Sequence, residues 1–170
     1  MLDHDAIARL LADLAGELQQ RHVRGDMFVV GGAAMALAYD TRRATRDVDA
    51  VFEPKAIVYE AAAVVGGRRG LPGDWLNDAV KGFLPGDDAA ARVVFDHPYL
   101  RVLTASPRYL LAMKLLAARV DVDHDDIVTL YDLCGFTTAE EGLDLLAATY
   151  PGRPMAPRVQ FLLEELFPAG

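Results

Sequence analysis

The sequence predicts an α+β fold, in which strands and helices are mixed in the first part of the chain and helices alone follow. Short apolar runs bounded by Gly or Pro alternate with helical patterns up to about residue 105. From residue 106 onward, the apolar residues recur with helical spacing. We therefore expect an α/β core over 1–105 and a helical part over 106–170 that packs on it as one compact unit.

The first predicted helix covers Leu2 to His22, where Leu and Ile residues form one stripe. Met27 to Val30 is a short apolar strand, with Gly25-Asp26 as punctuation before it and Gly31-Gly32 as an abrupt end. The elements expected next are an Ala-rich helix over 33–39, a strand over 48–52 and a helix over 55–65.

Trp75 to Phe83 lies between prolines and is expected to be a short helix or an irregular segment. Two strands separated by His97-Pro98 predict a hairpin. Ser106-Pro107 predicts a helix start, with Ser as the N-cap and Pro at the first helical position. The hairpin strands are expected over 92–95 and 100–104, and the helices over 106–119, 123–133, from Thr137 or Thr138 to 149, and 158–167.

The composition excludes several classes of protein. The formal charge is -8, which argues against a surface that coats nucleic acid, because such a surface needs clustered Lys and Arg. The single cysteine, Cys134, cannot form an intrachain disulfide, and the four His residues show no zinc-binding spacing. The start of the chain is acidic, and no apolar run reaches the roughly 18 residues of a membrane span. We expect a cytoplasmic protein with no membrane partner.

Gly31 and Gly32 are the first candidate site residues. A strand that turns sharply into a helix presents free backbone N–H groups, which attract anions. Glycine lets a phosphate approach the backbone without meeting a β-carbon. Taken alone, the pair is also compatible with an ordinary tight turn.

Asp47 and Asp49 are the second candidates. On a strand, residues two apart point to the same face, about 7 Å apart at their α-carbons. Two carboxylates this close repel each other unless a cation lies between them, and Mg²⁺ prefers hard oxygen ligands that it shares with phosphates. The alternative is a pair of solvated acids at the start of a strand.

The order of the two motifs along the chain indicates which class of phosphate-binding protein this is. A third glycine does not follow Gly31-Gly32, and no Gly-rich loop ends in Lys-Ser or Lys-Thr, so the two common phosphate-binding loops are disfavoured. Instead, a strand ends in Gly-Gly, a helix follows, and Asp-x-Asp begins fifteen positions after Gly32. This order resembles the nucleotidyltransferase superfamily, which carries Gly-Gly, a helix and then an acidic pair.

Within that superfamily, the chain resembles the small bacterial minimal nucleotidyltransferases related to abortive-infection toxins. The resemblance implies a polymerase-beta-like fold with a short mixed sheet flanked by helices, and it covers about half of the chain. The matching stretches are 30–52, which contains Thr45-Arg46-Asp47-Val48-Asp49, then Trp75-Leu76-Asn77-Asp78, and 106–133, which contains Lys114, Arg119 and His124-Asp125-Asp126-Ile127.

The resemblance implies roles for these residues. Gly31 and Gly32 would hold a triphosphate, and Asp47 and Asp49 would be catalytic and bind the metal. Lys114 would bind the triphosphate, although on an apolar helix it could also extend to solvent or to an acidic partner. The other residues that we place in the nucleotide-binding group are Arg46, Asn77, Asp78 and Arg119. Asn77 or Asp78 could instead be a cap beside a core Trp75, and Arg119 could stabilise the negative end of its own helix.

The sequence offers several candidates for a third catalytic carboxylate. The strand over 100–104 contains no carboxylate, although many nucleotidyltransferases place one on a later central strand. The resemblance suggests Asp126, which would orient Lys114 or act as a base. The alternatives are Asp125, Asp96 and Asp78, and first-turn acids such as Asp125 and Asp126 could also simply stabilise their helix.

These residues predict a metal-dependent nucleotidyltransferase that uses Mg²⁺ or Mn²⁺ and a nucleoside triphosphate. The resemblance implies that it would move a nucleoside monophosphate to an RNA or protein hydroxyl. The resemblance suggests a toxin–antitoxin or phage-defence setting with a cognate toxin or antitoxin partner. The alternative is a non-catalytic antitoxin or regulatory binding protein that keeps the fold.

Overall fold

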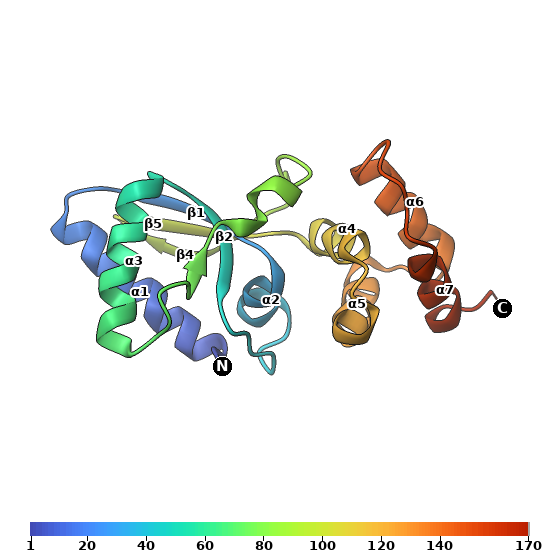
Figure 1. Ribbon diagram of the computed structural model, residues 1–170, viewed down its shortest axis with the longest axis horizontal. Coiled ribbons are helices and arrows are strands. Elements are labelled where there is room, and N and C mark those ends of the chain that lie inside the picture. The colour runs from blue at the N-terminus through green and yellow to red at the C-terminus, as the bar shows by residue number, and fades with distance from the viewer. Residues whose placement is uncertain (170) are drawn as a thin grey trace. The chain divides into compact units, whose positions relative to one another are not determined.

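The computed structural model describes residues 1–169 (Figure 1). It divides into two compact units. The first contains Met1–Gly82 and Ala90–Ala105, and the second contains Phe83–Ala89 and the residues from Ser106 onward. Among the residues that the structure describes, no helix has the length and apolar character needed to cross a membrane.

The first unit is built on a five-stranded mixed sheet with the order β3-β2-β1-β5-β4. The central strand β1 runs antiparallel to β2 and parallel to β5, while β3 is parallel to β2 and β4 antiparallel to β5. This is the short mixed sheet that the sequence predicted. The strands are β1 (Gly25–Val29), β2 (Val48–Glu53), β3 (Leu76–Asn77), β4 (Arg92–His97) and β5 (Leu100–Thr104).

Helices α1 (His4–Gln20) and α3 (Lys55–Arg69) pack against each other and cover one face of the sheet (Figure 1). Alternate residues on the strands point into this core, and those of β1 and β2 are fully or almost fully buried. The intervening residues, such as Phe28 and Val51, lie on the opposite face and are half-buried. Asp49 is on this second face, because it is two residues from Val51 on the same strand.

The predicted strands and the 97–98 hairpin are confirmed, with shifts of one or two residues. Gly25 and Asp26 belong to β1, so the prediction that they form a break before the strand was wrong. The helix after β1 begins at Gly31 as α2 (Gly31–Ala34) and continues as the π-helix η1 (Met35–Tyr39), where a regular helix over 33–39 was expected. The two glycines are therefore the first turn of the helix itself.

The segment Trp75 to Phe83 also differs from the expected short helix or irregular stretch. It contains the edge strand β3 and the 3-10 helix η2 (Ala79–Phe83). A two-residue strand leaves no periodic signal, because it is defined only by its pairing with β2. Trp75 is buried, and its indole N–H donates to the Ala62 carbonyl at 2.9 Å.

The second unit contains helices α4 (Pro107–Ala117), α5 (Val120–Cys134), α6 (Ala139–Thr149) and α7 (Pro157–Leu166). The predicted caps are confirmed: the Ser106 hydroxyl accepts from the Tyr109 N–H, and Thr138 forms a capping box with Glu141. The segment 83–89 belongs to this unit because Tyr109 and Tyr150 donate their hydroxyls to the carbonyls of Gly86 and Phe83.

The start of α5 corrects one sequence interpretation. Ala118 adopts a left-handed conformation with φ 53°, which ends α4 two residues before the expected position, and α5 begins at Val120. The first-turn acids are therefore Asp121 and Asp123. Asp126 lies in the second turn and is buried, so stabilisation of the positive helix end does not explain it.

Candidate functional site

The Gly-Gly bend lies directly against the acidic strand. The Val30 N–H donates to the Asp49 carbonyl at 3.0 Å, which fixes the end of β1 beside the start of β2. Gly31 has φ +63°, a left-handed conformation that favours glycine, and a β-carbon there would lie 3.4 Å from Asp49 Oδ2. The bend is thus held against the Asp49 carboxylate by backbone pairing.

The two predicted acids face the same side of the sheet. Asn77 on β3 is in register with Asp49 on β2, so their side chains share a face. The Asn77 amide Nδ2 lies 3.3 Å from Asp47 Oδ2 and donates to it. Since Asp47, Asp49 and Asn77 are all half-buried, they form one group that solvent reaches.

Thr45 completes the group. A β-carbon built on Gly32 would lie 2.9 Å from Thr45 Oγ1, so the hydroxyl occupies the space that a side chain at Gly32 would need. The backbone of Thr45 is fixed by reciprocal hydrogen bonds with Leu2, at 2.6 and 2.9 Å. The Gly-Gly bend, Thr45 and the two acids are therefore neighbours in one unit.

Among residues 1–169, the strands of the sheet supply no third carboxylate beside this pair. On β5, Arg101 and Leu103 share the Asp49 face, and Ala105 follows them. Asp96 pairs with Arg101, which lies at the level of Asp26, at the opposite end of β1 from Gly31. Asp96 is therefore far along the sheet from Asp49 and does not complete the pair.

Asp78 is held in a network at the end of β3. Tyr59 donates to Asp78 Oδ1 at 2.7 Å, and Lys55 Nζ lies 2.6 Å from Asp78 Oδ2. The hydrogen bond from Lys55, followed by that from Tyr59, lowers the pKa of Asp78 below its ordinary value of 3.8. Lys55 and Tyr59 come from α3, and nothing in their sequence pattern indicated this contact.

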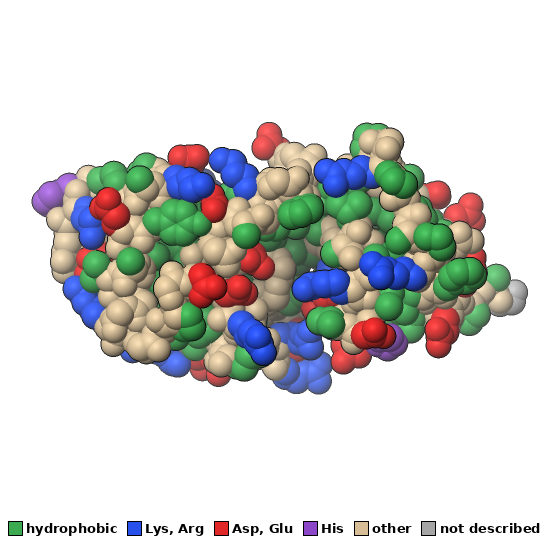
Figure 2. Space-filling view, in the orientation of Figure 1, with side chains coloured by type: hydrophobic (Ala, Val, Ile, Leu, Met, Phe, Trp, Pro, Cys, Tyr) green, Lys and Arg blue, Asp and Glu red, His purple; other side chains and the backbone are tan. Residues whose placement is uncertain are grey.

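Basic residues precede the acid pair. Arg42 is exposed and pairs with Asp40 at 3.1 Å, and Arg46 is exposed next to Asp47. Figure 2 shows acidic side chains gathered over the region of β2 and β3, with basic side chains nearby over the loop that leads into β2. Positive charge therefore adjoins the acidic group within the first unit.

Lys114, Asp123 and Asp126 form a cluster within the helical unit. Lys114 Nζ lies 2.8 Å from Asp123 Oδ1 and 2.9 Å from Asp126 Oδ2, and all three residues are buried. Arg119 also pairs with Asp123, at 3.2 Å. Of the readings open for Lys114, the structure shows contact with acidic partners, not extension to solvent.

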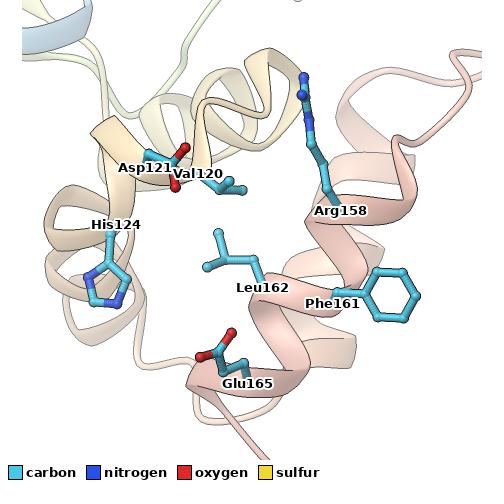
Figure 3. A pocket seen from close by; sticks show the side chains of 7 residues that line it. All are labelled: Val120, Asp121, His124, Arg158, Phe161, Leu162 and Glu165. Atoms are coloured by element: carbon cyan, nitrogen blue, oxygen red, sulfur yellow. The ribbon is translucent and has the colours of Figure 1, made fainter.

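The helical unit has a groove of its own between α5 and α7, with a volume of about 500 Å³ (Figure 3). Leu162 points into the space between the two helices (Figure 3). None of the predicted site residues lines this groove. Its lining is Val120, Asp121, His124, Arg158, Phe161, Leu162 and Glu165.

The chemistry of the acid pair suits one divalent cation. Within residues 1–169, no group of three or more His, Cys, Asp or Glu side chains could hold a metal ion by itself. Mg²⁺ is usually held by one or two carboxylates together with substrate phosphates and water. Asp47 and Asp49 are two carboxylates, which is the number that such a donor set takes from the protein.

The mixed sheet, the Gly-Gly bend and the adjoining acids define a domain of the nucleotidyltransferase class. Comparison with protein families agrees: the family described as "Nucleotidyltransferase of unknown function (DUF6036)" matches residues 6–138, and the chain belongs to this family. Neither the curated proteins nor the solved structures gave a match.

Proposed function

We propose that the protein is a metal-dependent nucleotidyltransferase that moves a nucleoside monophosphate from a nucleoside triphosphate to a hydroxyl of RNA or protein. One observation carries the proposal: the Gly31 backbone lies against the Asp49 carboxylate, while Asp47 faces the same side through Asn77. This closeness supports the proposal, because a glycine bend at a helix start can accept a phosphate and two carboxylates can hold a divalent cation.

Each residue has a defined task in this proposal. Asp47 and Asp49 would hold Mg²⁺ or Mn²⁺, which supplies positive charge to the phosphate oxygens when it is bound. Gly31 and Gly32 would let the triphosphate approach the backbone, and Arg46 would add positive charge beside it. Rate acceleration would come from positioning and charge stabilisation.

The transfer would be a nucleophilic displacement at the α-phosphorus. The acceptor hydroxyl oxygen forms a bond to the α-phosphorus, and the bond from that phosphorus to the bridging oxygen breaks. Pyrophosphate leaves with the bonding electrons, and the hydroxyl proton passes to a carboxylate or to water. The chain needs no further co-reactant for this step.

The remaining predicted residues rest on the resemblance. Lys114 and Arg119 as triphosphate ligands, and Asp126 as a third acid, remain proposals. The contacts of Lys114 with two buried carboxylates support a stabilising role inside the helical unit as well. Asp78 contacts Lys55 and Tyr59, and these contacts support a structural role for Asp78 at the end of β3. The toxin–antitoxin or phage-defence setting is likewise proposed from the resemblance.

A second candidate is a non-catalytic binding protein that keeps the fold, such as an antitoxin or regulator. The observation that favours it is the absence of a carboxylate on β5, where Leu103 and Ala105 occupy the positions nearest to Asp49. Such a protein would bind its partner independently of the acid pair.

An assay with labelled nucleotides separates the two candidates. The protein is incubated with each α-labelled nucleoside triphosphate, Mg²⁺ and whole-cell lysate, and the labelled macromolecules are resolved. A transferase labels one class of macromolecule, and Asp49→Asn abolishes the label. Asp26→Asn is the matched control, because Asp26 lies on the same sheet face at the far end of β1. If no nucleotide labels any macromolecule, the binding-protein candidate is the better one.

A further inference from the structure

Asn77 occupies an unusual place beside the acid pair. It is the last residue of the edge strand β3, and its register partner on β2 is Asp49. Its side chain nevertheless donates to the other acid, with Nδ2 lying 3.3 Å from Asp47 Oδ2. One side chain thus contacts Asp47 while its backbone is paired alongside Asp49.

The rest of the Asn77 side chain is also engaged. Its Oδ1 accepts from the Ala79 N–H at 3.2 Å, and Nδ2 is 3.4 Å from the carbonyl of Asp74. These local bonds fix which way the amide faces, because the oxygen must point to Ala79 and the nitrogen must therefore point away from it. The donor is held toward Asp47 by the turn that follows β3.

That turn is anchored to α3 next door. The Tyr59 hydroxyl accepts from the Asp78 N–H at 3.0 Å and donates to the Asp78 carboxylate at 2.7 Å. Lys55 closes the same network on the other carboxylate oxygen. The strand that carries Asn77 is only two residues long, so this anchor replaces the pairing that a longer strand would provide.

We infer that Asn77 is a positioning residue, which orients Asp47 for the cation and does not itself bind the nucleotide. The inference rests on the proposed function, since it concerns the same metal site. A carboxylate that accepts a hydrogen bond at one oxygen is restricted in its side-chain rotation. Loss of a residue that hydrogen-bonds to a metal ligand typically lowers metal affinity by about 10–100-fold.

The test measures binding of Mn²⁺ alone, without nucleotide. A residue that contacts only the nucleotide would leave this affinity unchanged, whereas a residue that acts through Asp47 would change it. Titration with Mn²⁺ is followed by paramagnetic broadening of the backbone amide signals of Gly31 and Val48, which detects weak binding in a protein of 18.5 kDa. Asp47→Ala defines the background.

Two substitutions of Asn77 are compared. Asn77→Ala removes the whole side chain, and Asn77→Ser keeps an oxygen that can accept from the Ala79 N–H but has no amide to reach Asp47. We expect both to weaken Mn²⁺ binding by about tenfold or more. Should Asn77→Ala fold poorly, a folded Asn77→Ser with weakened Mn²⁺ binding supports the inference by itself.

Tyr59→Phe is the matched structural control. It removes both hydrogen bonds to Asp78, while the Lys55–Asp78 ion pair and the bond from the Ala79 N–H to Asn77 Oδ1 remain to hold the turn. We expect a lower melting temperature, with Mn²⁺ affinity within about twofold of the unsubstituted protein. If Tyr59→Phe weakens Mn²⁺ binding as strongly as Asn77→Ala, local packing is responsible and the inference is overturned.

The outcomes distinguish this inference from the proposed function. If the unsubstituted protein shows no saturable Mn²⁺ broadening, or if the broadening survives Asp47→Ala, the metal site itself fails and the inference fails with it. If Mn²⁺ binds through Asp47 but Asn77→Ala and Asn77→Ser bind it equally well, the metal site stands and only the positioning role is wrong.

Discussion

Gly32 and Thr45 pack so closely that a β-carbon on Gly32 would lie 2.9 Å from Thr45 Oγ1. Real β-carbons do not approach other atoms this closely, so a side chain at Gly32 must displace Thr45. Because Thr45 precedes Asp47 by two residues and is clamped by Leu2, its displacement would reach the acid pair.

We therefore expect Gly32→Ala to destabilise the protein by about 1–3 kcal/mol, through overpacking, and to weaken binding of Mg²⁺ and nucleotide. Urea denaturation measures the first effect and calorimetry the second. Gly67→Ala is the control, since Gly67 is exposed in α3 and a β-carbon there would meet no atom within 4 Å beyond its own stretch of helix. That substitution should be stabilising by about 0.5–1 kcal/mol. Equal effects at the two glycines would contradict the close packing.

Combining Gly32→Ala with Thr45→Ala extends this prediction. Removal of Oγ1 takes away the nearest obstacle, so the double substitution should cost less than the sum of the two single ones. A double-mutant cycle in urea measures the coupling energy. Strict additivity would mean that the two residues do not touch in solution.

The second prediction concerns Lys114. Lys114→Met leaves Asp123 buried with Arg119 as its remaining partner and takes a cation away from buried Asp126. Removing one member of a buried ion cluster typically costs about 3–5 kcal/mol, because the carboxylates that stay buried lose the attraction of that cation. We expect a loss of this order in the free energy of unfolding.

Arg119→Ala tests the same cluster from its exposed side. The Arg119 side chain is 62% exposed, so its pair with Asp123 is screened by solvent, and its loss should cost at most about 1 kcal/mol. The two variants are compared by denaturation under one set of conditions. If Lys114→Met is as mild as Arg119→Ala, the Lys114 cluster does not contribute to stability.

The third prediction is a dependence on pH at Asp78. The hydrogen bond from Lys55, and after it that from Tyr59, lowers the pKa of Asp78 below 3.8 in the folded protein. A lowered folded pKa means that the stabilising contribution is present above the ordinary pKa and is lost as pH falls through the folded one. Asp78→Asn should therefore destabilise at neutral pH, and its effect should shrink below about pH 3.8.

Denaturation of the unsubstituted protein and Asp78→Asn between pH 7 and pH 3 measures this difference. Asp74→Asn serves as the comparison, because the Asp74 side chain is exposed and makes none of the ion pairs seen in residues 1–169. An Asp78→Asn effect that is constant with pH would show that the carboxylate charge is not involved.

Local signals in the sequence were sufficient to predict much of the fold. Ser106-Pro107 begins α4 at the expected residue, and the strand at Leu100 to Thr104 has the predicted ends, because cap chemistry and apolar runs are read from neighbouring residues. The resemblance to nucleotidyltransferases, which rested on the spacing from Gly32 to Asp47, is confirmed at the level of the family.

Other features depend on partners that are distant in sequence. The strand β3, the contact between Asn77 and Asp47, and the network of Lys55, Tyr59 and Asp78 arise only when α3 and β2 meet the segment after Trp75. The spacing of apolar residues along the chain does not predict such contacts. The π-helical continuation of α2 was also missed, because its Ala-rich sequence favours an ordinary helix equally well.

The most direct test of the central claim is calorimetric titration of a nucleoside triphosphate into the protein, with and without Mg²⁺, before and after Asp49→Asn. If Asp47 and Asp49 share a metal with the phosphates, binding requires Mg²⁺ and weakens at least tenfold in the variant, while Asp26→Asn binds normally. Nucleotide binding that is equally tight without Mg²⁺, or that is unchanged by Asp49→Asn, would contradict the proposed metal site.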